Sequence, residues 1–356
     1  MTTRRDFIKQ AVAAGVVSSM PHHFFAQDKP DQKNIVWANL LHLSVNMWED
    51  NNPMPSWDLA NCKTCEETVS KYRGFRPYLL FDEGIWDTVL KEMAAAGMNM
   101  VVIDLGDGVL YDSHPEIAVR NAWTPEKLRK ELAKIRKLGM EPIPKLNFSA
   151  CHDIWLGEYS RMLSTKKYYE VCRDLIHEVI DLFDTPRFFH LGMDEETAGH
   201  QRFFDYVIIR QNDLWWGDLY FYIGEVEKKN VRSWIWSDYA WHYPDVFFKK
   251  MPKSVVQSNW YYGSEFDISK LPENVKPRVD LYNQLEAYGY DQIPTGSNWS
   301  SDTNMEGTVD FCKKGIHESR LVGFMTAPWR MTFPQCLGQH RDAIAQIGRA
   351  IKKFNA

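Results

Sequence analysis

The stretch FFHLGMDEET (residues 188–197) runs from aromatic residues almost directly into three adjacent acids. The acids are Asp194, Glu195 and Glu196. Three neighbouring carboxylates inside a sheet would lose their hydration, which is costly unless the charges are paired. The stretch is therefore interpreted as a buried strand whose end lies at an active site.

Strand-like and helix-like stretches alternate along the chain on both sides of this segment. Apolar runs rich in valine, isoleucine and aromatic residues predict eight strands, at 35–46, 98–105, 140–148, 186–196, 231–238, 254–260, 290–296 and 319–329. Helical spacing predicts helices over 82–96, 124–139, 165–183, 202–229, 244–251, 304–315 and 335–353, with a less regular helical stretch before 290. The segment 124–139 is the clearest helix, because Thr124 caps it, Pro125 takes its first position and Gly139 ends it.

Most of the expected strands are followed by a helix, and no linker, repeat or low-complexity tract divides the chain. This rhythm predicts one α/β domain over residues 34–356, a single (β/α)8 TIM barrel, for which about 250 residues is a typical size. An open doubly wound sheet is the structural alternative. The lack of a glycine-rich phosphate loop after the first expected strand argues against it.

The composition narrows the range of functions. The chain has 356 residues, 44% of them hydrophobic, and a formal net charge of −5. A sizeable core is therefore available, and nucleic acid is not expected as a partner. Aromatic residues make up 14% and include 14 tryptophans, several of which stand beside polar and turn residues, as in QSNWYYG (257–263) and TGSNWSS (295–301). Aromatic faces at loop ends suit stacking against sugar rings, although plain core packing explains such residues equally well.

The N-terminal segment has the pattern of an export signal. Arg4 and Arg5 are paired in TTRRDFIK (residues 2–9), and the apolar AVAAGVV (11–17) follows. The apolar part is shorter than the roughly 20 residues that span a bilayer. Residues 1–26 are therefore predicted to be a twin-arginine signal peptide, with Ala26 at the cleavage site and a periplasmic or extracellular mature protein. No later segment is long and apolar enough to predict a membrane span.

Two of the six cysteines, Cys62 and Cys65, form a lone C-x-x-C motif. One such pair is a weak indication of zinc or redox chemistry, and no second pair completes a four-ligand site. A local disulfide between the two, or two free thiols, is the favoured interpretation.

Polar and aromatic residues gather at the expected carboxyl ends of the strands, where barrel enzymes place their active sites. They are Asn46, Asp104, Asp107, Asn147, His152, His190, Asp194, Glu195, Asp238, Trp260, Trp299 and Trp329. The set has few cations and no metal-ligand spacing, so it fits a neutral polyhydroxylated ligand. A carbohydrate is the expected partner, and neither a metal nor another cofactor is expected. The sequence leaves the oligomeric state open.

The segment HLGMDEE (190–196) resembles the H-x-G-x-D-E motif of family 20 glycoside hydrolases, the β-N-acetylhexosaminidases. In that family the motif closes the fourth barrel strand, and it follows the fourth expected strand here. The resemblance extends over about residues 98–330. WIWSD (234–238) is similar to the family's tryptophan-bearing strand that ends in an acid, and GFMTAPW (323–329) is similar to the last strand.

The resemblance implies roles for the first two acids. Glu195 would be the general acid that protonates the leaving oxygen. Asp194 would hold the substrate's own acetamido group, which attacks the anomeric carbon in place of an enzyme nucleophile. Two adjacent acids disfavour joint ionisation, so one can stay protonated near neutral pH. Because neighbouring side chains on a strand point to opposite sides, a bend is needed to bring both into one pocket, with Glu196 pointing away or capping the next helix.

A second set of residues is expected to contact the sugar. It comprises His190, His152, Asn147, Asp238, Trp236, Trp260, Trp299 and Trp329. Asp238 would bind a hydroxyl, or serve as nucleophile or base for a substrate without an acetamido group; a solvated acid at a strand end is the plainer interpretation. The two histidines would orient an acid or a hydroxyl, or else be structural.

Three departures from the family pattern keep other functions open. Pro144-Lys145-Leu146-Asn147 stands where the family has Pro-Glu-Ile-Asp. His42 and Asn46 stand on the first strand, where the family has an arginine, and Arg330 follows Trp329 where an acid is common. One alternative is a sugar-binding barrel that has lost turnover, since fold does not imply activity. Another is a metal-dependent sugar isomerase or epimerase, whose candidate ligands are Glu195, Asp238, His152 and Glu286.

Overall fold

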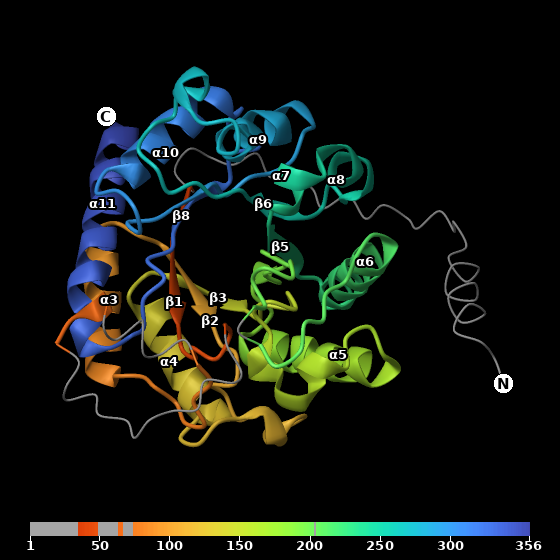
Figure 1. Ribbon diagram of the computed structural model, residues 1–356. Coiled ribbons are helices and arrows are strands. Elements are labelled where there is room, and N and C mark those ends of the chain that lie inside the picture. The colour runs from red at the N-terminus through yellow and green to blue at the C-terminus, as the bar shows by residue number, and fades with distance from the viewer. Residues whose placement is uncertain (1–34, 49–62, 67–73, 203) are drawn as a thin grey trace.

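The structure, a computed structural model, describes residues 35–48, 63–66, 74–202 and 204–356. The predicted signal peptide and Cys62 lie outside these residues. The described chain forms an eight-stranded parallel sheet with helices packed around it (Figure 1). None of the described helices is both long and apolar enough to cross a membrane.

The sheet curls into the predicted (β/α)8 barrel. Its strands are β1 (Val36–His42), β2 (Met100–Asp104), β3 (Glu141–Lys145), β4 (Phe188–His190), β5 (Arg232–Trp236), β6 (Val256–Ser258), β7 (Thr295–Gly296) and β8 (Gly323–Thr326). Strands β1 to β6 pair in sequence order, and β8 pairs with both β7 and β1. Parallel bridges between Gln257 and Gln292 and between Trp260 and Thr295 join the segments of β6 and β7, which closes the barrel.

Helices follow most of the strands along the outside of the barrel (Figure 1). They are α3 (Glu83–Ala95), α4 (Pro125–Lys137), α5 (Lys166–Leu182), α6 (Asp213–Glu227), α7 (Tyr239–His242), α8 (Pro244–Lys250), α9 (Lys276–Ala287), α10 (Asn304–Gly315) and α11 (Leu337–Asn355), with 3-10 turns η3 (Pro115–Ile117), η4 (Ile154–Arg161), η5 (Ile268–Lys270) and η6 (Pro334–Cys336). Helix α4 has the predicted ends: Thr124 accepts a hydrogen bond from the Lys127 amide, and Gly139 lies beyond the last turn at φ 79°.

The interior of the barrel changes from apolar to polar toward the carboxyl ends of the strands. Its apolar part contains Val36, Ala38, Leu40, Met100, Val102, Ile143, Phe188, Trp234, Trp236, Val256, Ile293, Met325 and Ala327. The side chains of a strand alternate between the two faces of the sheet. The next inward positions on β1 to β4 are therefore the register-paired residues His42, Asp104, Lys145 and His190. This polar layer lies directly under the site described below.

The predicted helix over 202–229 is shorter in the structure, because α6 begins only at Asp213. The preceding segment is tied down by side chains instead of helical hydrogen bonds. The Gln201 amide pairs with both the N–H and the C=O of Ile208, at 2.7 and 2.8 Å, and Arg210 is buried in an ion-pair cluster. Asn212 then turns the chain at φ 52°. These side-chain contacts do not follow helical spacing, so the apolar periodicity of the segment does not reveal them.

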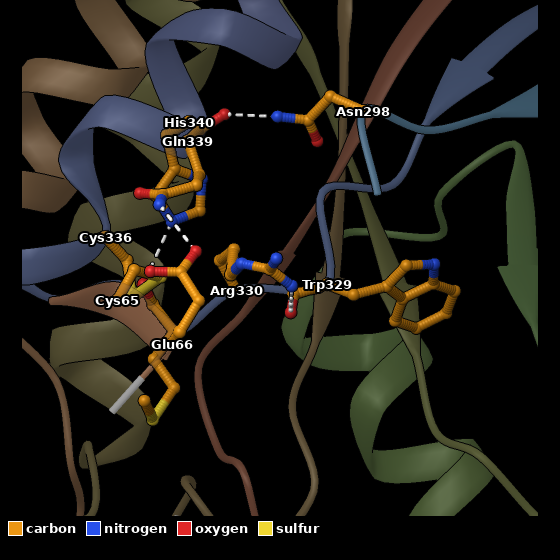
Figure 2. The surroundings of a disulfide bond; sticks show 9 residues. Cys65, Glu66, Asn298, Trp329, Arg330, Cys336, Gln339 and His340 are labelled. Atoms are coloured by element: carbon orange, nitrogen blue, oxygen red, sulfur yellow. Dashed lines mark hydrogen bonds between the residues drawn. A yellow bond between two sulfur atoms is a disulfide. The ribbon is translucent and has the colours of Figure 1, made fainter. Parts of the chain in front are cut away.

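The interpretation of Cys65 as a partner of Cys62 or as a free thiol is wrong. Cys65 forms a disulfide with Cys336, 271 residues further along the chain, with a Cα–Cα distance of 4.8 Å (Figure 2). The bond joins the short segment 63–66 to the start of α11. Gln339 supports this junction by donating to the Glu66 carboxylate at 3.3 Å, while its carbonyl accepts from Asn298 at 2.9 Å.

Candidate active site

A sharp turn after β4 brings two neighbouring acids into one hollow. Gly192, Met193 and Glu195 have φ values of 72°, 75° and 56°. This left-handed conformation is unfavourable for residues with a side chain, by roughly 1–2 kcal/mol each, and such strain is concentrated at functional sites. As a result Asp194 and Glu195 both line the same cavity, which is the bend that the sequence required.

Hydrogen bonds from neighbouring strands hold the turn in this shape. The Asn147 side chain accepts from the Met193 amide at 3.2 Å, and Asp238 accepts from the Glu195 amide at 2.9 Å. Gly192 passes so close to Asn147 that an added Cβ would lie 1.9 Å from its Oδ1 atom. Glycine is therefore required at position 192 both for its φ angle and for its lack of a side chain.

His152 connects the two acids. Its Nε2 atom lies 3.5 Å from an Asp194 oxygen and 3.3 Å from a Glu195 oxygen. Burial alone would lower the pKa of His152, but the charges of Asp194 and Glu195 and the hydrogen bond to Glu195 outweigh it and raise the pKa to about 9. His152 is therefore a cation at neutral pH.

Glu195 is ionised in the free protein. Burial would raise the pKa of Glu195, but the hydrogen bond and charge of His152 lower it, with further contributions from His200 and Arg278. The His152–Glu195 pair thus shares one proton at neutral pH, and that proton resides mainly on the imidazole.

Asp238 contacts the turn from behind Glu195. Burial and the charges of Asp194 and Glu195 raise the pKa of Asp238 to about 8, so it is protonated at neutral pH. One carboxyl oxygen accepts from the Glu195 amide, and the other is buried with no hydrogen-bond partner among the described residues. Asp238 lines a second hollow next to the main cavity.

The structure explains two of the departures from the family pattern. Asn147 donates its amide to Asp194 Oδ1 at 2.8 Å, so an amide supports Asp194 where a carboxylate would repel it. Lys145 is fully buried and pairs with Asp104 inside the barrel. Burial would raise the pKa of Asp104, but Lys145 and His42 hold it at about 2. The cation at position 145 is therefore neutralised below the site.

Aromatic rings wall the cavity, whose volume is about 570 Å³. Trp260 stacks on Tyr262 with ring centroids 5.1 Å apart, and Trp329 donates its indole N–H to the Tyr262 hydroxyl at 2.9 Å. Trp299 is 46% exposed and stands at the rim, with the Arg330 guanidinium 4.3 Å from its ring centroid. His42 and Trp48 complete the lining near β1.

Seven of the ten side chains expected at the site line this cavity. They are Asn147, His152, Asp194, Glu195, Trp260, Trp299 and Trp329. Asp238 lines the second hollow, as described above. His190 and Trp236 lie in the barrel interior, with ring centroids 4.6 Å apart, and Trp236 lies 5.8 Å from the Trp329 ring. Burial holds the pKa of His190 well below its usual range, so this imidazole is neutral.

Sequence reasoning assigned no role to several cavity residues. Tyr262 lies in the aromatic stretch QSNWYYG (257–263), and Arg278 lies in the first turn of the least regular predicted helix. No local pattern marks Arg278, because its place at the site depends on how α9 packs beside β6 and α7.

Three residues of the site could hold a cation. His152, Asp194 and Glu195 offer ligand atoms that all lie within 4.8 Å of one another. A metal requires a neutral imidazole, whereas the two carboxylates keep His152 protonated, so a metal would have to displace that proton. Glu286, the remaining acid of the isomerase hypothesis, pairs with Arg320 on another part of the molecule and does not line the cavity.

Comparisons with known proteins agree with the barrel fold. No protein-family model matches the sequence, and no curated protein matches it. Among solved structures, the chain is similar to a family 20 exo-β-N-acetylglucosaminidase from Vibrio harveyi, with TM-score 0.52, 13% identity and coverage of 90% of this chain and 57% of that one. It is also similar to a β-N-acetylhexosaminidase from Bacteroides fragilis (0.51, 11%, 86% and 65%) and to one from Streptomyces coelicolor (0.54, 11%, 89% and 69%). The chain thus spans about three fifths of the first two structures, and at these identities the likeness shows a shared fold.

Proposed function

We propose that this protein is a glycoside hydrolase that releases terminal N-acetylhexosamine residues. The observation that carries the proposal is the turn at 192–195, which places two adjacent carboxylates in one aromatic-walled cavity, with His152 within 3.5 Å of both. The solved structures with a similar fold include enzymes that act on N-acetylglucosamine and related sugars, which supports this substrate class.

In the proposed mechanism Glu195 is the general acid. The proton shared by His152 and Glu195 passes through the Glu195 carboxyl to the glycosidic oxygen as the bond to the anomeric carbon breaks. A substrate that displaces water from the cavity favours the protonated form of Glu195, because burial favours a neutral carboxyl group. His152 stays close enough to receive the proton back when water enters.

Asp194 orients the acetamido group of the substrate in this proposal. Its carboxylate accepts the acetamido N–H, so that the acetamido oxygen can attack the anomeric carbon, the route known for substrate-assisted glycosidases. Asn147 and His152 fix the position of Asp194 by a hydrogen bond and an ion pair. The indole faces of Trp260 and Trp329 would pack against the apolar faces of the sugar.

A panel of aryl glycosides tests this proposal. The protein from residue 27 onward would be incubated with aryl N-acetylglucosaminide, N-acetylgalactosaminide, glucoside and galactoside, with and without a chelator. Release from the acetamido sugars alone, unaffected by chelator, is the expected result. Release from the plain sugars would instead require an enzyme nucleophile or base, with Asp238 the nearest candidate. Loss of activity with chelator would favour the metal-dependent alternative, and binding without release would favour a non-catalytic barrel.

We also propose that the protein is exported through the twin-arginine pathway. Arg4, Arg5 and the apolar stretch after them support this, and so does the Cys65–Cys336 disulfide, because such bonds persist in oxidising compartments. Cell fractionation of the wild type and of the Arg4→Lys, Arg5→Lys double variant would test it. Accumulation of the double variant in the cytosol is expected, and unchanged export would refute the proposal.

A further inference from the structure

A second hollow adjoins the main cavity at Glu195. Its volume is about 840 Å³, and it shares Glu195, Trp260 and Arg278 with the main cavity. Aromatic residues of α7 and its ends line it, namely Tyr239, Trp241 and Tyr243. A general acid must lie between the sugar that it releases and the group that leaves. The second hollow is therefore placed where a leaving group would extend from Glu195.

Arg278 is the side chain at the boundary of the two hollows. Its guanidinium carbon lies 4.7 Å from the Trp241 ring centroid and 5.6 Å from that of Trp260. Neither an ion pair nor a hydrogen bond joins this guanidinium to any residue in the part of the chain that the structure describes. A half-buried guanidinium with all of its donors unused is well suited to bind an anion.

The arginine is also held in place. Asn259 donates its amide to the Arg278 carbonyl at 2.7 Å, and its oxygen accepts from the Trp241 indole at 2.9 Å. One buried side chain thus fixes both the backbone that carries Arg278 and the ring on which its guanidinium lies. Such preorganisation reduces the entropy lost when a ligand binds.

The charges around this boundary leave Arg278 without a counter-ion during catalysis. Arg210, the other arginine of the second hollow, is neutralised by Glu196 and Asp218 at 2.6 and 3.1 Å. Asp238 is protonated, and Asp194 accepts from Asn147 and, in the proposed mechanism, from the acetamido group of the substrate. Glu195 must carry a proton to act as an acid, and it then no longer balances Arg278.

We infer that the second hollow binds the leaving sugar and that Arg278 recognises an anionic group on it, such as the carboxylate of a uronic acid. This inference rests on the proposed function, because it takes Glu195 as the acid between the two hollows. The planar guanidinium would bind a carboxylate with two hydrogen bonds, while the aromatic residues of α7 and its ends pack against the sugar ring. An anion at this position also removes the electrostatic effect by which Arg278 favours ionised Glu195, so an acidic leaving sugar would help to keep the acid protonated.

Two disaccharides that differ only in charge test the inference. N-acetylglucosamine would be β-linked through the same hydroxyl to glucuronic acid in one and to glucose in the other. The expected result is a kcat/KM at least about tenfold higher for the acidic disaccharide, since hydrogen bonds to charged groups are the stronger ones. Arg278→Gln should reduce this ratio to about one, and Arg278→Lys, which keeps the charge but not the planar fork, should retain part of it.

Lys276→Gln is the matched control. Lys276 lies on the same helix, pairs with Glu273 and lines neither hollow. The Lys276→Gln substitution removes one positive charge, as Arg278→Gln does, but should leave the ratio of the two kcat/KM values as in the wild type. Equal kcat/KM values for the two disaccharides in the wild type would overturn the inference, and so would a ratio that survives Arg278→Gln.

Failure of the proposed function can be told apart from failure of the inference. If neither disaccharide is cleaved, the proposed function fails for these substrates. The dissociation constants of the two uncleaved disaccharides for the wild type and for Arg278→Gln, measured by calorimetry, then decide the inference separately. Tighter binding of the acidic disaccharide that is lost in Arg278→Gln supports it, and equal binding overturns it.

Discussion

Glu195 and Glu196 are neighbours in sequence and opposites in environment. The Glu196 carboxylate is 4% exposed and accepts from the Arg210 guanidinium at 2.6 and 2.8 Å, as well as from the backbone amides of Ala150 and Arg210. The Glu195 side chain is 31% exposed, and among the described residues its carboxylate forms ion pairs with two histidines, at 3.3 and 3.5 Å. A saturated carboxylate holds the fold together, whereas a carboxylate with few fixed partners can exchange a proton.

The largest effect is expected from Glu195→Gln. The amide keeps the size of the side chain but cannot donate a proton to a leaving oxygen. The kcat on an aryl N-acetylglucosaminide should fall by about 10²–10⁴-fold, the usual contribution of a general acid. Steady-state kinetics would measure it, with Glu158→Gln as control, because Glu158 is exposed and lines neither hollow. Activity within a few-fold of the wild type would remove Glu195 from the mechanism.

Asp194→Asn should be the next most damaging change to turnover. The amide cannot stabilise the charge that develops on the acetamido group during its attack, so kcat on acetamido substrates should fall by about 10²-fold. Steady-state kinetics on an aryl N-acetylglucosaminide would measure this loss. Near-wild-type turnover of acetamido substrates by the variant would rule out substrate assistance.

Glu196→Gln should lower the stability of the fold, in contrast to the two substitutions above, which lower turnover. Removing this carboxylate leaves Arg210 buried with Asp218 as its remaining acidic partner, and loss of one partner from a buried pair costs about 3 kcal/mol or more. Urea unfolding of the variant and the wild type would measure the difference in free energy. An unfolding free energy equal to that of the wild type would show that the ion pair of Glu196 with Arg210 does not stabilise the fold.

The smallest effect is a dependence of stability on pH. The pKa of His152 rises from 6.5 to about 9 on folding, so its contribution is fully present below pH 6.5 and is lost as pH rises through 9. The pKa of Asp238 rises from 3.8 to about 8 on folding, so its contribution to stability is also lost as pH rises through 8. The unfolding free energy should fall by on the order of 2 kcal/mol between pH 6.5 and 9.5.

Urea unfolding at several pH values measures this change, and His152→Gln should flatten the curve. The cluster around Glu196 should not contribute to the slope, because Arg210 stays charged throughout this range. A wild-type stability that is constant or rises over this interval would contradict the assignment of a shared proton to His152 and Glu195.

The parts of the fold that could be predicted from the sequence are those with local signals. The eight strands appear where apolar runs predicted them, and α4 has the capping residues that its sequence shows. The bend after β4 could be predicted from the sequence, because two adjacent acids on a regular strand cannot face the same pocket. The residues at the expected carboxyl ends of the strands also include most of the predicted cavity residues, since barrel geometry gathers strand ends at one face.

The parts that could not be predicted depend on contacts between distant segments. The partner of Cys65 lies 271 residues away, and spacing along the chain carries no information about it. Residues 204–212 are kept from helix formation by Gln201 and by the burial of Arg210, neither of which alters the local periodicity. Arg278 reaches the site only because Asn259 and Trp241 fix α9 against β6 and α7.

The disulfide also has a mechanical meaning. Cys65 follows β1 and Cys336 follows β8, so the bond closes a covalent ring that contains β2 to β8 and leaves only β1 outside. A force applied to the two ends of the chain would be carried across this bond. It could pull out β1 and unravel α11, while the seven strands inside the ring, together with the turn at 192–195, would bear no load. Reduction of the bond would place the whole barrel in the path of the force.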